Sequence, residues 1–246
     1  KVPGYEEYIT VCILGDSNID VYPHSLYKII AHTILNSLHY IPSFKLDPSE
    51  HTEYHHMGKQ FKIEQSKDVF RVGTDGVLLG ALADVHGASS VLAVGTGTGL
   101  ISLMLAQRNP QAYFLGLDIN EDAAALTKLN FENAPFHARL KNRHQDFKTF
   151  ETEEQFDLVV SNPPYFEESG SEKDKIARQT VELNFRQLIA NSAQLLSENG
   201  IFSVIIPVEA GEIFISIGKE NHLFLHRRIN IKGIENSKAK RLILEF

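Results

Sequence analysis

Hydrophobic and polar residues follow two patterns from about Ser89 to the end of the chain. Short apolar runs, which are typical of buried strands, are separated by segments in which apolar residues recur every three or four positions, as along a helix. The strands predicted from these runs are 90–94, 113–118, 139–143, 156–161, 201–206, 222–231 and 241–246. Because strands that alternate with helices form parallel sheets covered on both faces, the pattern predicts an α/β fold with a mostly parallel, twisted sheet of seven strands.

Local end signals place three helices between these strands, over residues 100–108, 121–131 and 181–197. The first stops near Pro110, because proline cannot continue a helix. The second follows Asn120, whose side-chain oxygen can accept a hydrogen bond from an N–H of the first turn. The third ends at Asn199-Gly200, where glycine can take the left-handed conformation that closes a helix.

Residues 1–56 show neither the short apolar runs nor the helical periodicity over long stretches. They contain four prolines and one predicted amphipathic helix, over 27–41, which carries too many polar residues to span a membrane. His51, His55 and His56 lie close together, but no carboxylate or thiolate stands at a spacing that defines a metal site, so none is expected. We predict a junction near Met57 that separates an extension of unknown role, 1–56, from a domain over 57–246.

The composition is that of an ordinary soluble protein, since 43% of the 246 residues are hydrophobic and 22% are charged. The one cysteine, Cys12, excludes an internal disulfide and fits a reducing compartment. No apolar run reaches the length of a membrane span, and the first residues carry acid before any apolar run, unlike a signal peptide. A cytoplasmic location without membrane attachment is expected.

The net charge of −7 argues against a nucleic-acid partner, but the charge is unevenly distributed. Residues 219–241 hold seven Lys and Arg against two Glu. This run predicts either a basic surface or an ordinary solvated face, and the sequence leaves both open.

A glycine-rich turn joins the first predicted strand to the first predicted helix, with the sequence Gly95-Thr96-Gly97-Thr98-Gly99. Glycine lets a backbone turn sharply and approach a ligand without a Cβ clash, beside the exposed N–H groups of a helix end. The spacing is not that of a Walker phosphate loop, and the third glycine of the dinucleotide fingerprint is absent. The turn therefore predicts a nucleotide-type ligand, although several folds share this signal.

Two carboxylates follow the next two predicted strands. Asp118 lies 23 residues after Gly95, where an acid at a strand end can accept hydrogen bonds from both ribose hydroxyls. The alternative for Asp118 is an N-cap of the following helix. Asp146 can accept a hydrogen bond from an adenine amino group, with Phe147 beside the ring. Together with the glycine turn, the two acids predict a site for an adenosine-containing cofactor.

The segment Asn162-Pro163-Pro164-Tyr165 follows the fourth predicted strand directly. Two prolines stiffen the backbone and remove two N–H donors. An exocyclic amine is a poor nucleophile because its lone pair is delocalised into the ring. If the Asn162 side-chain oxygen and the Pro163 carbonyl accept its two N–H bonds, the lone pair can point at a sulfonium methyl group, while Tyr165 stacks on the base. The segment therefore predicts methyl transfer to an amino nitrogen, against the alternative of a simple turn.

These ordered motifs resemble those of class I S-adenosylmethionine-dependent methyltransferases that act on amino nitrogens. More narrowly, residues from about 57 to 246 look like the bacterial tRNA1(Val) (adenine-37-N6)-methyltransferase family, which modifies the adenine 3′ of the anticodon. The further motifs that carry this resemblance are Phe61-Lys62-Ile63, Arg71–Gly80, Leu103–Arg108, Ala177-Arg178 and Lys240-Arg241-Leu242.

The resemblance implies a Rossmann-like class I methyltransferase fold, S-adenosylmethionine as the cofactor and a tRNA as the substrate, without a metal. It implies that Thr74 and Asp75 lie near the methionine end of the cofactor. Arg178 is expected either to contact an RNA phosphate or to pair with Glu182 one turn later. The oligomeric state stays open.

Two features depart from the family pattern. The acid that normally stands two positions before the first glycine is replaced by Ala93, so one contact to the cofactor is missing. Residues 1–56 are not covered by the resemblance, and their role stays open between a substrate-binding extension and a segment that binds a partner. Because Asn-Pro-Pro-Tyr is shared with protein glutamine methyltransferases, a glutamine amide is the alternative acceptor. A non-catalytic binding protein is the third hypothesis.

Overall fold

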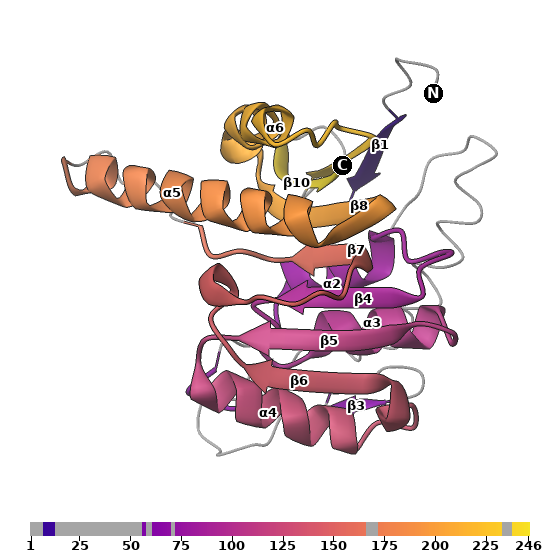
Figure 1. The fold of residues 1–246 in the computed structure, drawn as a ribbon. Coiled ribbons are helices and arrows are strands. Elements are labelled where there is room, and N and C mark those ends of the chain that lie inside the picture. The colour runs from indigo at the N-terminus through magenta and orange to yellow at the C-terminus, as the bar shows by residue number, and fades with distance from the viewer. Residues whose placement is uncertain (1–6, 13–55, 58–60, 70–71, 166–171, 233–237) are drawn as a thin grey trace.

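The computed structural model describes residues 7–12, 56–57, 61–69, 72–165, 172–232 and 238–246 (Figure 1). The helix predicted over 27–41, together with His51 and His55, lies outside these residues. Among the helices that are described, none combines the length and apolar character needed to cross a membrane.

Eight strands form one sheet in the order β1-β9-β10-β8-β7-β4-β5-β6 (Figure 1). Strand β10 runs antiparallel to both of its neighbours, and the other pairs are parallel. Seven strands correspond to those predicted: β4 (Ser90–Val94), β5 (Tyr113–Asp118), β6 (Leu140–His144), β7 (Phe156–Ser161), β8 (Leu196–Pro207), β9 (Arg227–Lys232) and β10 (Ala239–Glu245). The predicted α/β fold with a mostly parallel sheet is therefore confirmed.

The eighth strand, β1 (Glu7–Cys12), was not predicted. It lies at the outer edge of the sheet and pairs in parallel with β9, so that Glu7 stands opposite Arg227. Its partner lies near the other end of the chain, and a six-residue segment carries no local sign of such a distant pairing. A separate ladder joins β2 (His56–Met57) to β3 (Lys62–Ile63).

Within the described residues, five α-helices accompany the strands: α2 (Thr74–Leu82), α3 (Leu100–Arg108), α4 (Glu121–Glu132), α5 (Glu172–Leu195) and α6 (Gly211–Glu220). Helix α3 has the predicted bounds, and α4 is capped as predicted, since the Asn120 side chain accepts from the Ala123 N–H at 3.0 Å. Helix α5 begins earlier than the predicted residue 181. Helices α2 and α6 were not predicted.

Alternate residues of each strand point to opposite faces of the sheet, as the pleat requires. In β4, Val91 and Ala93 belong to the apolar cluster that includes α2 and α3, whereas Leu92 and Val94 belong to the cluster that includes α5 and α6. The molecule therefore has three layers, with the sheet in the middle (Figure 1).

Helix α2 contains two glycines, which lower helix propensity and explain why its periodicity was missed. At Gly80, an added Cβ would lie only 2.7 Å from the sulfur of Met104 in α3. At Gly76, it would lie 3.4 Å from a methyl of Leu100. These glycines let α2 pack closely against α3, beside the glycine-rich turn.

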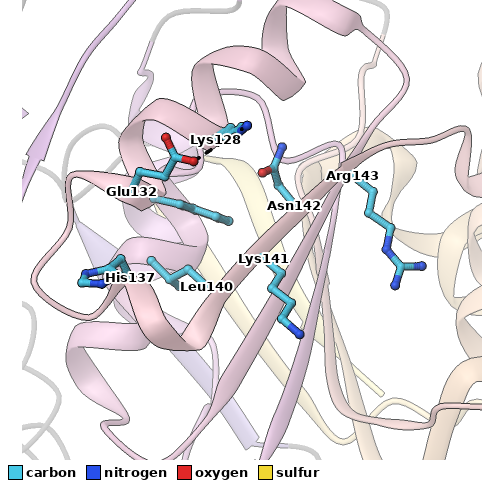
Figure 2. Close-up of a pocket in the computed structure, with 8 residues that line it drawn as sticks. Lys128, Glu132, His137, Leu140, Lys141, Asn142 and Arg143 are labelled. Carbon is cyan, nitrogen blue, oxygen red and sulfur yellow. Dashed lines mark ion pairs between the residues drawn. The ribbon is translucent and has the colours of Figure 1, made fainter.

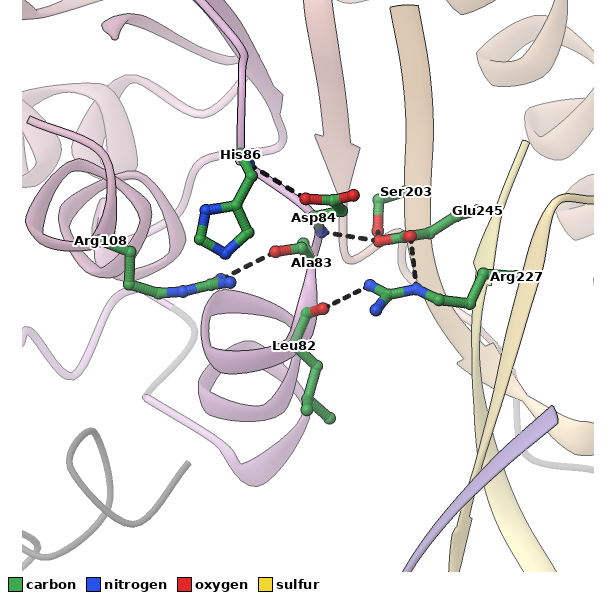
Figure 3. Close-up of polar contacts among 8 residues, drawn as sticks. All are labelled: Leu82, Ala83, Asp84, His86, Arg108, Ser203, Arg227 and Glu245. Carbon is green, nitrogen blue, oxygen red and sulfur yellow. Dashed lines mark hydrogen bonds and ion pairs between the residues drawn. The ribbon is translucent and has the colours of Figure 1, made fainter. Parts of the chain in front are cut away.

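A buried ionic network fixes the C-terminal end of α2 (Figure 3). The side chain of Glu245, which is 1% exposed, accepts from the Asp84 N–H at 2.9 Å and the Ser203 hydroxyl at 3.0 Å, and pairs with Arg227 at 2.7 Å. Arg227 also donates to the carbonyl of Leu82, the last residue of α2, at 2.6 Å. The β9–β10 pair thus holds this end of the helix.

Arg108, at the end of α3, serves the same end of α2. Its guanidinium donates to the carbonyls of Gly80 at 3.0 Å and Ala83 at 2.8 Å. Burial lowers the pKa of Arg108 to about 10, although Asp84 and Glu245 favour the charged form. Helix α2 is therefore tied to both α3 and the C-terminal strands.

Candidate active site

The carboxyl ends of β4, β5, β6 and β7 lie side by side, because these strands are parallel neighbours in the sheet. Each end carries one of the predicted motifs: the glycine-rich turn follows β4, Asp118 ends β5, Asp146 follows β6, and Asn162 follows β7. Ligands bind at this edge in open α/β sheets. The topology therefore gathers four separate motifs into one site.

Three glycines of the turn adopt left-handed backbone conformations, with φ of 67° at Gly95, 60° at Gly97 and 83° at Gly99. A Cβ would be strained at all three positions. Apart from the chain neighbours, no heavy atom of the described residues lies within 4 Å of a Cβ built at Gly95 or Gly97, so open space lies beside the backbone there. The turn thus has room for a ligand to approach its main chain.

Hydrogen bonds hold the turn from two sides. The Gly95 and Thr96 N–H groups donate to the carbonyl of Leu117 in β5, at 2.9 and 3.0 Å. From α4, Thr127 donates to the carbonyl of Gly97 at 2.7 Å, and Asn130 donates to that of Thr98 at 2.8 Å. The turn is therefore preorganised by β5 and α4.

Asp118 is part-exposed at the end of β5, and both of its carboxylate oxygens accept backbone hydrogen bonds. The Gly97 N–H donates to Oδ2 at 2.8 Å, and the Asn120 N–H donates to Oδ1 at 2.9 Å. The N-cap role considered for Asp118 is wrong, because Asn120 caps α4. Each carboxylate oxygen can accept more than one hydrogen bond, so Asp118 can still receive a ribose hydroxyl.

Asp146 caps the short helix η2 (Phe147–Thr149), since its Oδ1 accepts from the Lys148 N–H at 2.9 Å. The neighbouring Phe147 is buried in the apolar cluster under α5. Its ring is therefore largely covered by protein, with 9% of the residue exposed, so little of it is left to flank an adenine.

Thr96 and Ala93 bear on whether this edge fits the expected cofactor. Thr96 is only 7% exposed, and its buried hydroxyl has no hydrogen-bond partner among the described residues. Ala93 is 3% exposed and packs in the cluster of α2 and α3. The left-handed glycines, the open space and the two carboxylates fit an adenosine-containing cofactor, while Ala93 offers it no polar contact.

The segment 162–165 follows β7 without regular structure. The preceding Ser161 is buried and its hydroxyl donates to the carbonyl of Val94 at 3.0 Å, which ties the segment to β4. Pro163 is buried and Pro164 is exposed, while Asn162 and Tyr165 are part-exposed. The segment therefore has one face against the protein and one towards solvent.

Tyr165 joins a cluster of three side chains from distant parts of the chain: Asp75 in α2, Tyr165 and Arg241 in β10. The Tyr165 hydroxyl donates to Asp75 Oδ2 at 2.8 Å and accepts from Arg241 Nη2 at 2.5 Å. Arg241 Nε also donates to Asp75 Oδ2 at 3.0 Å. The guanidinium carbon lies 4.6 Å from the centre of the Tyr165 ring, which is a cation–π distance.

Burial and Asp75 both raise the pKa of Tyr165, and Arg241 offsets only part of that rise. The phenol therefore stays protonated and can donate to Asp75. Burial lowers the pKa of Arg241, but the bonds to Asp75 and Tyr165 outweigh it, so the net shift is upward and the guanidinium stays charged. Thr74, which begins α2, is exposed next to this cluster.

The sequence did not mark Arg241 as a site residue. It appeared within Lys240-Arg241-Leu242, one of the motifs that carried the family resemblance, and at the end of the basic run 219–241, neither of which assigned it a role in the site. No spacing rule links it to Asp75, which lies 166 residues earlier in the chain. The family motif was the one signal that could have found it.

Carboxylates lie against the arginines of the basic run 219–241, of which residues 233–237 lie outside the described part of the chain. Three of its arginines face carboxylates: Arg227 pairs with Glu245, Arg228 with Glu212 and Arg241 with Asp75. The side chain of Arg178 lies outside the described residues, and Glu182 pairs with Arg186 at 3.3 Å. In the part of the chain that the structure describes, no group of three His, Cys, Asp or Glu is placed to hold a metal ion.

A cavity of about 300 Å³ lies between α4 and β6, away from the predicted site residues (Figure 2). Its lining includes Lys128, His137, Lys141 and Arg143. In Figure 2, the side chains of Lys141 and Arg143 point away from Lys128 and His137. The four basic groups therefore do not converge on a single ligand position.

Comparison with known proteins places this site in a family context. Residues 65–212 match the model of the methyltransferase small domain. A tRNA1(Val) (adenine(37)-N6)-methyltransferase of Flavobacteriaceae bacterium (strain 3519-10) is 54% identical over 188 residues, which cover 76% of this chain and 81% of the relative. The enzyme of the same name from Bacteroides thetaiotaomicron is 40% identical over 192 residues, with the same two coverages.

Solved structures agree on the fold. The N-methyltransferase NodS of Bradyrhizobium japonicum WM9, in complex with S-adenosyl-L-homocysteine, superposes with a TM-score of 0.50 at 18% identity. The match covers 70% of this chain and 82% of NodS. At this identity the likeness bears on the fold alone.

Proposed function

The chain belongs to the bacterial tRNA1(Val) (adenine(37)-N6)-methyltransferase family, and on that premise we propose which residues carry out its methyl transfer. The cofactor of this family fold is S-adenosylmethionine. The acceptor that we propose is the exocyclic N6 of the adenine 3′ of the anticodon in a valine tRNA. We further infer that the enzyme acts in the cytoplasm, where tRNA is modified, and the single cysteine fits such a reducing compartment.

The cofactor would lie along the carboxyl edge of β4, β5 and β6. The backbone of Gly95, Thr96, Gly97 and Gly99 would approach it, since these residues form the preorganised turn with open space beside it. Asp118 would accept the ribose hydroxyls. When bound, S-adenosylmethionine supplies an electrophilic methyl group on a positively charged sulfur.

The adenine and methionine ends would be held by two further carboxylates. Asp146, which follows β6 and caps η2, would accept the adenine amino group. Thr74 and Asp75, at the start of α2, would hold the methionine end. Asp75 Oδ2 already receives Tyr165 and Arg241, and its Oδ1 accepts no hydrogen bond from the described residues, so Oδ1 can receive the methionine ammonium.

The target amine would be activated by Asn162 and Pro163. The Asn162 side-chain oxygen and the Pro163 carbonyl accept its two N–H bonds, which draws the nitrogen out of conjugation with the ring and directs its lone pair. Pro164 keeps the segment stiff, because its ring fixes φ. Catalysis then rests mainly on alignment, without an obligatory strong base. Tyr165 would stack on the base and fix its plane.

One observation supports this assignment above the others: the contact between Tyr165 and Asp75. It joins the amino-nitrogen motif after β7 to the family segment Thr74-Asp75-Gly76 at the start of α2. The Asn-Pro-Pro-Tyr motif alone leaves adenine and glutamine open as acceptors. The contact supports adenine, because it joins the acceptor motif to part of Arg71–Gly80, one of the motifs that carry the resemblance to the tRNA-modifying family.

The proposal is tested with purified protein, labelled S-adenosylmethionine and an unmodified valine tRNA transcript. We expect label to enter this tRNA and not a transcript in which the adenine 3′ of the anticodon is replaced by guanine. A peptide chain release factor serves as the competing acceptor, and label in that protein alone would select a glutamine acceptor. Calorimetry that detects no binding of S-adenosylmethionine would select a non-catalytic role.

We also infer that residues 57–246 form the catalytic domain. The family model matches within this range, and the described residues of the candidate site all lie inside it. Residues 1–56 would then be an extension that adds β1 to the sheet edge.

A further inference from the structure

We propose that Arg241 is a positioning residue that holds the Tyr165 ring as a rigid platform on which the target base stacks. This inference rests on the proposed function, since it assigns a role within the proposed acceptor site. It concerns a residue of the last strand, far in sequence from every motif of the site.

The contacts fix the Tyr165 side chain at two points. At its tip, the hydroxyl is held by Arg241 at 2.5 Å and by Asp75 at 2.8 Å. On its face, the guanidinium carbon of Arg241 lies 4.6 Å from the ring centre. A hydroxyl contact alone would leave the ring free to tilt, and a stacked cation alone would leave it free to turn in its plane. Together they determine the ring plane.

The supports of this cluster are themselves rigid. Arg241 lies in β10, between β8 and β9 in the sheet, and its side chain is only 22% exposed. Asp75 lies in α2, whose far end is held by the buried network of Glu245 and Arg227. Contacts from the sheet and from α2 therefore fix the position of the Tyr165 ring, although the segment 162–165 has no regular structure of its own.

The arrangement suits a flat, extended acceptor. Because the guanidinium covers one face of the ring, a base that stacks on Tyr165 would use the other face. A purine extracted from its strand recovers stacking on such an aromatic platform. A glutamine side chain offers only a small amide plane to the same ring. A held Tyr165 therefore favours adenine over glutamine, a preference that Asn162 and Pro163 cannot supply.

Arginine and lysine differ in the feature that the proposal requires. Both are cations that can pair with Asp75, but only the planar guanidinium can bond the hydroxyl and stack on the ring at once. Arg241→Lys therefore keeps the ion pair and removes the platform. A merely structural ion pair would tolerate this change.

The test uses the full-length protein and an anticodon stem-loop RNA that carries 2-aminopurine at the target position. This fluorescent base is quenched when it stacks on an aromatic ring. With the wild type, we expect binding to quench the base relative to Tyr165→Ala. With Arg241→Lys, we expect the quench to be lost and kcat on valine tRNA to fall about 10- to 100-fold, because small misplacements of a reacting group have effects of this size. The calorimetric Kd for S-adenosylmethionine should stay unchanged.

Arg228→Lys is the matched control, because Arg228 lies in the neighbouring strand β9 and pairs with Glu212 at 3.4 Å. We expect it to retain wild-type fluorescence and kcat. Tyr165→Phe keeps the ring and removes the hydroxyl, so it should share the defect of Arg241→Lys. The double variant should then be no worse than the poorer single variant, since both remove one interaction.

Three results would overturn the proposal: wild-type quenching and kcat in Arg241→Lys, multiplicative losses in the double variant, or a loss of cofactor affinity that parallels the loss of kcat. Methyl transfer by the wild type in the same assay tests the proposed function separately. A wild type that leaves valine tRNA unmethylated contradicts the proposed function. The quenching and kcat of the Arg241 and Tyr165 variants, relative to an active wild type, decide the role of Arg241.

Discussion

Asn162 is the residue on which the proposed chemistry depends most directly. Its side-chain oxygen is one of two acceptors for the target amine, and the other is a backbone carbonyl that no substitution removes. Asn162→Ala should lower the rate of methyl transfer about 100- to 1,000-fold, as the loss of a comparable preorganised hydrogen-bonding group does in other enzymes. Single-turnover kinetics at saturating cofactor measures this effect.

The same variant should bind S-adenosylmethionine with unchanged affinity, because Asn162 follows β7 while the proposed cofactor residues follow β4, β5 and β6. Asn133→Ala, at the exposed end of α4, is the matched control and should leave both measurements unaffected. A loss of cofactor affinity with a normal rate at saturation would show that Asn162 has been given the wrong role.

Tyr165 should titrate later than an ordinary tyrosine. Its pKa is raised, chiefly by burial and then by Asp75, so the folded protein favours the protonated phenol. The stabilisation from this cluster is therefore complete below about pH 10, the ordinary value, and is lost as the pH rises through the higher folded-state value. An alkaline titration monitored by phenolate absorbance measures the ionisation of Tyr165.

The wild-type curve should differ from that of Tyr165→Phe by one phenol among the eight tyrosines of the chain. That phenol should ionise above the ordinary value, and kcat should fall over the same pH range. If the difference curve is centred at the ordinary value, the hydrogen bond from Tyr165 to Asp75 does not persist in solution.

At the scale of elements, the β9–β10 pair positions α2 from both ends. Arg241 contacts Asp75 at the beginning of the helix, and Arg227 and Glu245 contact Leu82 and the Asp84 N–H at its end. Helix α2 has little stabilisation of its own, since it contains two glycines and no described side chain caps its N-terminus. Its place in the site is therefore set by these contacts and by α3.

Glu245→Ala should destabilise the protein by about 3–5 kcal/mol, because it removes the buried carboxylate that the Arg227 guanidinium pairs with and that accepts from the Asp84 N–H. Chemical denaturation measures the free energy of unfolding. Glu220→Ala is the control: Glu220 pairs with Arg186 at the surface, and loss of an exposed pair costs at most about 1 kcal/mol. Equal effects of the two substitutions would contradict the network in Figure 3.

Local signals predicted elements well where one run of sequence contains all the information. Strands β4, β5 and β7 and helix α3 have the predicted bounds, because each is a buried apolar run bounded by a turn or a proline. Asn120 was identified as a cap because the bond it makes is only three residues long. Helix α2 was missed since its glycines serve contacts with α3 that the local pattern does not contain.

The site divides in the same way. Its four strand-end motifs could be placed at one edge, because the carboxyl ends of parallel strands must lie together. Arg241 could not be placed, because its contacts with Asp75 and Tyr165 depend on how β10 enters the sheet. The basic run 219–241 was ambiguous for a similar reason, since only the fold brings Glu212, Glu245 and Asp75 to its arginines.

At the scale of the whole molecule, the first described strand closes the edge opposite the cofactor side of the sheet. Strand β1 pairs with β9 along all six of its residues, whereas β6 ends the sheet at the other side. An open edge strand is a template for pairing with another chain. We therefore expect β1 to protect β9 rather than to take part in chemistry.

Removal of residues 1–56 should leave methyl transfer and cofactor affinity within about threefold of the full chain, because no described contact of the site involves β1, and a change below about 0.7 kcal/mol corresponds to that factor. The shortened protein should self-associate as its concentration rises, since β9 loses its partner. Sedimentation velocity, run alongside tRNA methylation assays on both proteins, measures the two effects separately.

A shortened protein that stays monomeric and folded but no longer binds valine tRNA would instead make residues 1–56 part of the substrate site. A charge substitution on β9, Asn230→Lys, distinguishes edge pairing from general instability, because it should restore the monomer without altering catalysis.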